Sequence, residues 1–171
     1  MEENVLKPRA SRHLALGALL LGLGACGGPA GPPPALVDLE QLQARVRSQR
    51  PRALLIVFWA TWCKPCVEEI PALVATHSRH QADLEILAVS LDTFLNTNER
   101  SLALVEAQLQ QTPTPYENVL FTGSQDGLFE AFELPGGIPY AMLFDATGRL
   151  VRRFNGQVSA AELGTALAAA R

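Results

Sequence analysis

The chain has 171 residues, a hydrophobic content of 48% and a formal net charge of −3 at pH 7. This length suits one domain plus a leader, because domains commonly run to about 100–150 residues, and the apolar content is ordinary for a protein with a buried core. The small negative net charge gives no electrostatic reason to propose that the chain binds nucleic acid, or that it has a basic surface that binds membranes. The cysteine count is three, so at least one cysteine lies outside an intramolecular pair.

The first 25 residues have the pattern of a secretory signal peptide. Three basic residues, Lys7, Arg9 and Arg12, precede residues 14–25, which are all Leu, Ala or Gly. A membrane-spanning helix needs about 20 apolar residues, so this run is too short and too rich in glycine for a typical anchor. A basic start followed by a short apolar core is instead typical of a signal peptide.

Residues 23–26, Leu-Gly-Ala-Cys, resemble the bacterial lipobox, whose cysteine is lipidated and becomes the first residue of the mature chain. The resemblance implies a signal peptide at 1–25, lipidation of Cys26 and a protein anchored by lipid on the periplasmic side of a bacterial membrane. Gly27 follows in place of an aspartate, which favours the outer membrane. The Gly- and Pro-rich residues 26–35 predict a tether. The alternative is an uncleaved N-terminal anchor with an incidental cysteine.

Residues 36–171 are expected to form one domain. A first helix is predicted to end near Ser48, before the helix-breaking Pro51. Residues 53–58 are a continuous apolar run rich in branched side chains, as expected for a central strand that is covered on both faces. The prediction of the first helix is based on four apolar residues at helical spacing: Leu36, Leu39, Leu42 and Val46.

Residues 59–66, Trp-Ala-Thr-Trp-Cys-Lys-Pro-Cys, connect that strand to a helix predicted to run to about His80. Cys63 then lies at the exposed start of the helix, where unpaired N–H groups and the helix dipole favour its thiolate near neutral pH. A thiolate is the nucleophile of disulfide exchange, and Cys66, one turn further, is within reach to resolve a mixed disulfide. Pro65 suits the first helical turn.

A zinc site and a purely structural disulfide are weaker interpretations of the cysteine pair. A structural zinc site needs four ligands, and His77 and His80 lie several turns downstream on the same helix, so we expect no metal. A structural disulfide between Cys63 and Cys66 closes a very small loop and constrains little of the unfolded chain. Redox exchange is the best interpretation.

The later elements alternate between strands and helices. A strand, the cysteine helix and a second strand imply a parallel pair joined by a right-handed crossover. Pro71 predicts a kink in the cysteine helix, and Asp92 and Glu99 are expected to be loop and helix-cap residues. The predicted elements are a strand at 84–91, a loop at 92–98, a helix at 99–111, a strand at 118–121, a helix at 125–132, a hairpin of 140–144 and 150–154 around a turn at 145–148, and a helix at 160–170.

Residues 59–66 resemble the active-site motif of the thioredoxin superfamily, and the extension 67–71, Val-Glu-Glu-Ile-Pro, is similar to the TlpA/ResA-type thiol-disulfide oxidoreductases, which act outside the cytoplasm. The resemblance extends from about Leu36 to the C-terminus, and residues 137–139, Gly-Ile-Pro, are its other specific part. It implies an α/β thioredoxin-like fold with a central mixed β-sheet flanked by helices. Residues 99–111 would be the TlpA-type helical insertion, and the redox-active disulfide would need no cofactor.

The resemblance also assigns roles to individual residues. Ile138 and Pro139 match the cis-proline that faces the cysteines and leaves the preceding backbone free to bind an extended substrate. Glu69 matches a glutamate three residues after the second cysteine. It lies one turn from Cys66, where a partly buried carboxylate can take the proton of the thiol; alternatively it is an exposed acid that favours the helix dipole. Trp62 is expected on an apolar rim that contacts partners.

The function implied is a membrane-tethered reductant of protein disulfides. A membrane thiol reductase would supply its electrons, and cytochrome c maturation or copper-site assembly would use them. Spacing does not encode the direction of electron flow, which reduction potentials set, so a general disulfide oxidant stays open. A thioredoxin-fold chaperone for copper(I) is a binding alternative, because copper(I) favours thiolates. A thiol peroxidase would normally place its peroxidatic cysteine in a different local motif.

Overall fold

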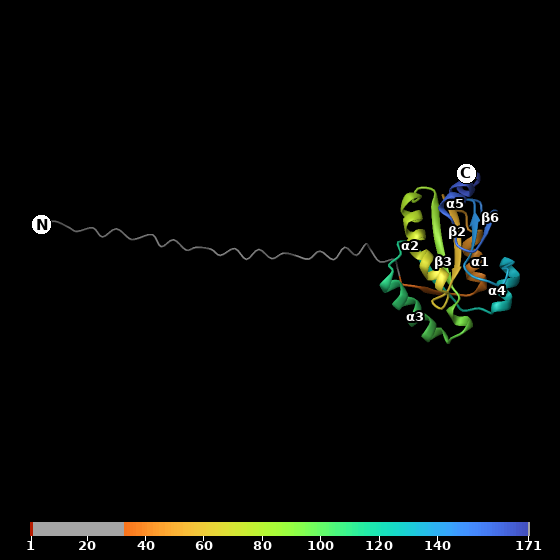
Figure 1. Ribbon diagram of the computed structural model, residues 1–171, viewed down its shortest axis with the longest axis horizontal. Coiled ribbons are helices and arrows are strands. Elements are labelled where there is room, and N and C mark those ends of the chain that lie inside the picture. Colours follow the sequence, from red (N-terminus) through yellow and green to blue (C-terminus); the bar gives the residue numbers. More distant parts are fainter. Residues whose placement is uncertain (2–32, 171) are drawn as a thin grey trace.

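The computed structural model describes Met1 and residues 33–170, which form a six-stranded mixed sheet with helices on both faces (Figure 1). The strand order is β1-β4-β3-β2-β5-β6. The predicted signal peptide and the predicted lipidation site, Cys26, lie outside the described residues. Within the described part of the chain, none of the helices combines the length and apolar character needed to cross a bilayer.

The predicted α/β class is confirmed, and the elements from β2 onward lie within one residue of their predicted bounds. The predicted loop after β3 contains a short 3-10 helix, η1. The bounds are β1 (Ala35–Val37), α1 (Leu39–Arg47), β2 (Ala53–Trp59), α2 (Lys64–Arg79), β3 (Leu84–Ser90), η1 (Asp92–Phe94), α3 (Asn98–Gln111), β4 (Glu117–Phe121), α4 (Gln125–Phe132), β5 (Tyr140–Phe144), β6 (Leu150–Asn155) and α5 (Ala160–Ala169).

Strand β2 lies at the centre of the sheet and is buried along its whole length. It pairs in parallel with β3 and antiparallel with β5. Because side chains alternate along a strand, Leu55 and Val57 pack with α2, α3 and α5, whereas Leu54 and Ile56 pack with α1 and α4 on the opposite face. Figure 1 shows α2 and α3 on one side of the strands and α1 and α4 on the other. Both faces of β2 are thus covered by a hydrophobic core, which explains why its sequence is an uninterrupted apolar run.

The N-terminal part of the domain differs from the prediction. A helix that includes Leu36 is wrong, because Leu36 lies in β1 and pairs with Leu120 of β4. Helix α1 is preceded by Asp38, whose side chain accepts a hydrogen bond from the Gln41 amide at 2.8 Å, while the Gln41 side chain accepts one from the Asp38 amide at 3.0 Å. This capping box fixes the start of α1 at Leu39, so Leu36 lies before the helix.

The two edges of the sheet are short or charged. Edge strand β1 has three residues. Edge strand β6 exposes two consecutive arginines: Arg152 lies 3.7 Å from Glu162, and Arg153 lies 2.5 Å from Glu133. Short strands and charged side chains at an edge hinder pairing with another chain.

Two glycines provide a test of this backbone. Gly148 closes the turn between β5 and β6 with φ +84°, and an added Cβ would lie 2.9 Å from the carbonyl oxygen of Val46. Because that backbone region costs a residue with a Cβ about 1–2 kcal/mol, we expect Gly148→Ala to lower the free energy of unfolding by at least about 1 kcal/mol. Urea denaturation of the oxidised protein measures this change.

The matched control is Gly164→Ala in α5. A Cβ at this position meets nothing within 4 Å. Since glycine inside a helix costs about 0.5–1 kcal/mol relative to alanine, this variant is expected to be more stable than the wild type. If both variants raised the free energy of unfolding, or both lowered it, the result would contradict the backbone conformations described at these two glycines.

Candidate active site

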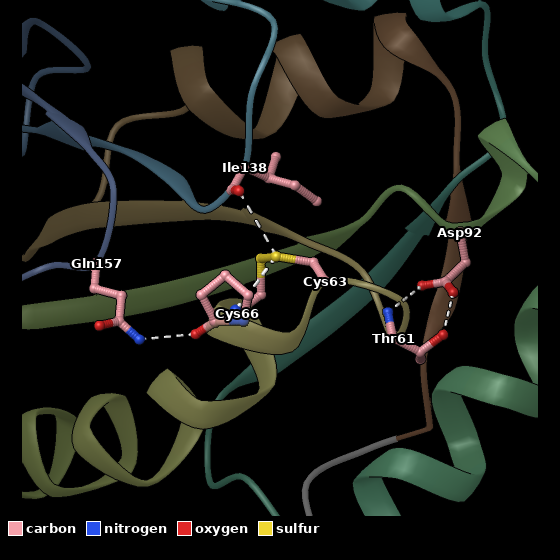
Figure 2. Close-up of a disulfide and its surroundings, with 7 residues drawn as sticks. Thr61, Cys63, Cys66, Asp92, Ile138 and Gln157 are labelled. Atoms are coloured by element: carbon pink, nitrogen blue, oxygen red, sulfur yellow. Dashed lines mark hydrogen bonds between the residues drawn. A yellow bond between two sulfur atoms is a disulfide. The ribbon is translucent and has the colours of Figure 1, made fainter.

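The two cysteines lie where β2 ends and α2 begins (Figure 2). Cys63 is the N-cap of α2, and its sulfur accepts a hydrogen bond from the Cys66 amide at 3.3 Å. Pro65 lies in the first turn, where an amide N–H has no partner within the helix. The two sulfurs form a disulfide, with the Cα atoms 5.3 Å apart. The helix start therefore directs one amide donor, that of Cys66, at the sulfur of Cys63.

Cys63 is less accessible than its place at a helix start predicts. It is 6% exposed, against 2% for Cys66. The segment before β5 covers it, and the carbonyl oxygen of Ile138 lies 3.7 Å from the Cys63 sulfur (Figure 2). In the disulfide this sulfur carries no proton, so the contact is not a hydrogen bond, whereas a reduced thiol has a proton to donate to that oxygen. Cys63 is nevertheless the more exposed residue of the pair.

The peptide bond between Ile138 and Pro139 is cis, the conformation that the resemblance implies. Pro139 leads directly into β5, whose first residue, Tyr140, pairs with Phe58 of β2. This antiparallel pairing brings the segment across the end of β2 and places the carbonyl group of Ile138 beside Cys63. The binding of substrate by Ile138 and Pro139 stays a prediction.

Glu69 lies on the buried face of α2, one turn beyond Cys66, and is 4% exposed. This burial argues against an exposed acid that interacts with the helix dipole. Its carboxylate accepts a hydrogen bond from the Val158 amide. Burial raises the pKa of Glu69, and the hydrogen bond from Val158 offsets only part of that rise. The carboxyl group is thus suited to exchanging a proton closer to neutral pH than an exposed glutamate, although its role stays a prediction.

Tyr116 is a neighbour of Glu69 that the sequence did not reveal. It lies in the segment before β4, is 4% exposed, and packs edge-on against the His77 ring with 5.9 Å between the ring centroids. Burial, together with the negative charge of Glu69, raises the pKa of Tyr116 well above its usual range. Tyr116 therefore keeps its hydroxyl proton.

Asp92 was expected to be a loop or helix-cap residue, yet it is fully buried behind the cysteine loop. Its carboxylate accepts hydrogen bonds from the Thr61 amide at 3.0 Å and from the Thr61 hydroxyl (Figure 2). It accepts a third from the Ser90 hydroxyl at 2.7 Å. These bonds fasten the loop before Cys63 to the end of β3. The signal in the sequence was an acidic residue directly after a strand parallel to β2, since the carboxyl ends of parallel strands meet at one edge of a sheet.

The remaining residues around the cysteines have different environments. Trp62 is 47% exposed, as a residue on a contact rim requires, whereas Trp59 is 3% exposed and lies in the core. The Gln157 side chain donates a hydrogen bond to the carbonyl oxygen of Pro65 at 2.8 Å and links the β6–α5 loop to α2 (Figure 2). Among the described residues, no group of three or more His, Cys, Asp or Glu side chains is arranged to hold a metal.

Comparison with known proteins places these features in context. The model of the AhpC/TSA family matches residues 32–168. Thiol-disulfide oxidoreductase ResA from Geobacillus thermodenitrificans is 29% identical over 133 residues, which are 77% of this chain and 71% of that protein.

Solved structures of similar shape include StoA from Bacillus subtilis, with a TM-score of 0.55, 22% identity, and coverage of 68% of this chain and 83% of that one. A thioredoxin-related protein from Neisseria meningitidis serogroup B has a TM-score of 0.59 and 23% identity, with 72% and 87% covered. These likenesses confirm the predicted thioredoxin-like fold.

The burial of Glu69 predicts a pH-dependent stability. Because the folded pKa of Glu69 is raised, the unfolded chain releases this proton first as pH rises, so the contribution to stability is full below about pH 4 and is lost as pH passes the folded pKa. Glu69→Gln has no proton to lose. The free energy of unfolding of Glu69→Gln minus that of the wild type should therefore increase as the pH is raised past about 4, by up to about 1.4 kcal/mol per pH unit. The difference should then level off above the folded pKa of Glu69.

Urea denaturation of the oxidised proteins at a series of pH values measures this difference. The control is Glu68→Gln, which removes an exposed carboxylate from the same turn. Identical pH dependence of wild type and Glu69→Gln would show that Glu69 is not buried as described.

Proposed function

We propose, since this chain belongs to the AhpC/TSA family, that it exchanges disulfides with protein substrates through Cys63 and Cys66. It is a thioredoxin-fold thiol-disulfide oxidoreductase of the ResA and StoA type. One observation carries the proposal: the cysteine pair lies at the start of α2, between a covering carbonyl group from Ile138 and the buried carboxyl group of Glu69.

In the first step the thiolate of Cys63 attacks a sulfur of the substrate disulfide. A bond forms between Cys63 and that sulfur, the substrate disulfide breaks, and the second substrate sulfur leaves as a thiolate. The start of α2 favours the attacking anion, because the Cys66 amide already donates to the Cys63 sulfur. We propose that Trp62 and the backbone at Ile138 hold an extended substrate beside that sulfur; the exposure of Trp62 and the closeness of the Ile138 carbonyl group to Cys63 support this role.

In the second step Cys66 loses its proton and attacks the sulfur of Cys63. The mixed disulfide breaks, the Cys63–Cys66 disulfide forms, and the substrate leaves as a dithiol that has gained two electrons. We assign Glu69 as the proton acceptor, because its carboxylate lies one turn from Cys66 and its pKa is raised by burial. A thiol reductant must then return two electrons to the protein.

We further propose that the protein works as a reductant on the periplasmic side of a bacterial membrane, held there by a lipid on Cys26. The leader pattern of residues 1–25 and the similarity to a protein named ResA support this localisation. A membrane thiol reductase would supply electrons, and cytochrome c maturation or copper-site assembly would use them. The alternatives are a general disulfide oxidant and a copper(I) chaperone.

A reduction potential and a trapping experiment test the direction of electron flow. The Cys63–Cys66 couple is expected to lie nearer to the roughly −270 mV of thioredoxin than to the roughly −120 mV of a dedicated oxidant. Cys66→Ala cannot resolve mixed disulfides and should capture substrates in cells. The control is a variant that also carries Cys63→Ala, which should capture none.

Captured cytochrome c apoprotein or a copper-site protein would support the reductant. Capture of many newly secreted proteins, with a high potential, would support the oxidant instead. A wild-type protein whose Cys63 does not react with any disulfide would contradict the exchange activity itself.

The anchor has its own test. Intact-mass analysis of the membrane fraction is expected to show a mature chain that begins at Cys26 and carries the added mass of a lipid. Cys26→Ser should release the protein from the membrane fraction. A mature chain that begins at any other residue would exclude lipidation at this cysteine.

A further inference from the structure

Most arginines of the domain gather at the end of the sheet opposite the cysteines. Strands β2 and β3 begin at this end and β5 ends there, because Leu54 pairs with both Glu85 and Phe144. The last turns of α1 and α2 reach the same end, since an added Cβ at Gly148 would contact Arg47 and the Leu84 amide donates to the His80 carbonyl oxygen. We call it the basic end, after its six arginines: Arg45, Arg47, Arg50, Arg52, Arg79 and Arg149.

Hydrogen bonds between segments hold several of these arginines in place. The Arg50 amide donates to the carbonyl oxygen of Ala146 at 3.3 Å, in the turn between β5 and β6. The Arg52 side chain donates to the carbonyl oxygen of Gln81 at 3.0 Å, just after α2. A cavity of about 550 Å³ is lined by Arg45, Arg50 and Arg52. The exposed arginines of this end are Arg47, Arg79 and Arg149.

Few carboxylates balance these charges. Four lie at the basic end: Asp83, Glu85, Glu117 and Asp145. Glu85, Glu117 and Asp145 form ion pairs with three of the arginines. Arg47, Arg50 and Arg79 form no ion pair with a described residue. The rest of the described chain has eleven carboxylates and four basic residues, so the net charge of −3 conceals a strong separation of charge.

The direction of the helices explains this separation. Each α-helix follows the carboxyl end of a strand that is parallel to β2, so each begins at the end of the sheet that carries the cysteines. Acidic residues favour the first turn of a helix and basic residues the last, because of the helix dipole. The first turns of four helices contain Glu40, Glu99, Asp126 and Glu162, whereas the last turns of α1 and α2 are basic. These local preferences therefore add up over the whole domain.

We propose that the basic end docks on the anionic headgroups of the bilayer that anchors the protein, and that Cys63 then faces away from the lipid. This inference rests on the proposed lipid at Cys26. Residues 26–34 span at most about 30 Å, so an anchored domain stays close to the membrane surface. Strand β1 runs parallel to β4 and begins opposite Val119, so the chain reaches the sheet from the direction of the basic end.

Distance decides which charges a membrane attracts or repels. The field of an anionic surface decays over about 8 Å at physiological salt. The seven residues of β2 extend over about 20 Å, so the acidic first turns of the helices lie outside that range when the basic end touches the lipid. The same carboxylates oppose the reverse orientation. Docking thus presents Cys63 to soluble clients, and contact with a membrane-embedded reductase requires the domain to leave the surface.

The test uses the full chain, isolated from cell membranes and placed in lipid nanodiscs. The discs contain phosphatidylcholine alone or with about 30% phosphatidylglycerol, and a few lipids carry a gadolinium chelate that broadens the NMR signals of nearby amides. In anionic discs we expect the amides of 79–85 and 145–149 to be broadened severalfold more than those of 61–66. The difference should vanish in neutral discs and at about 0.5 M salt, where the field decays over about 4 Å. Equal broadening of both ends in anionic discs would overturn the proposal.

A pair of double variants tests the arginines. Arg47→Gln combined with Arg79→Gln removes two exposed, unpaired cations, each worth about fivefold in binding, so docking should weaken about twenty-fivefold. The extra broadening at the basic end should then be lost. The control, Arg152→Gln combined with Arg153→Gln, changes the net charge equally but in β6, and should keep it. Both should exchange a soluble disulfide at the wild-type rate, which shows that they fold. An equal loss in the control would contradict a specific basic end.

The outcomes separate this inference from the proposed function. If the chain carries no lipid, the proposed anchor fails, and sedimentation with vesicles of the same two compositions still reports whether the basic end prefers anionic lipid. If the wild type does not react with disulfides, the exchange proposal fails and the docking result stands. Binding to polyglutamate without binding to anionic vesicles would assign the basic end to an acidic protein and overturn the membrane proposal.

Discussion

The hydrogen bond from the Cys66 amide to the Cys63 sulfur is the interaction on which the site depends, and the fold is arranged to hold its two ends still. Strand β2 is paired on both sides, so its carboxyl end has little freedom. Asp92 then fastens the loop at Thr61 to β3, and Gln157 fastens the first turn of α2 through Pro65. A helix start that moved relative to the sulfur would lose the favourable geometry for a thiolate.

Two buried carboxylates serve this site in different ways, and the number of donors around each accounts for the difference. Asp92 accepts three hydrogen bonds from side chains and backbone of Thr61 and Ser90, and acts as a fixed link between segments. Glu69 accepts a hydrogen bond from Val158 in a mostly apolar core, so burial dominates its titration. With few donors to hold its charged form, Glu69 is suited to the role of proton acceptor that we propose for it.

Local patterns in the sequence predicted the cysteine helix, the central strand and the hairpin, since each depends on residues close together in the chain. Leu36 shows where periodicity misleads: its spacing suits a helix, but the cap formed by Asp38 decides where the helix starts. By contrast, the hydrogen bonds between Asp92 and Thr61 and between Val158 and Glu69 link segments that are far apart in the sequence. No local pattern contains such contacts, and the covering of Cys63 by Ile138 belongs to the same class.

The short or charged edge strands of the sheet affect where a client protein could bind. With β1 only three residues long and β6 carrying Arg152 and Arg153, neither outer strand is a good template for an unfolded polypeptide. If the protein exchanges disulfides as proposed, extended clients would be steered away from the flanks of the molecule and toward the short backbone stretch at Ile138, where we propose that they bind. Selectivity for the cysteine pair would then come as much from docking places that are closed as from the one that is open.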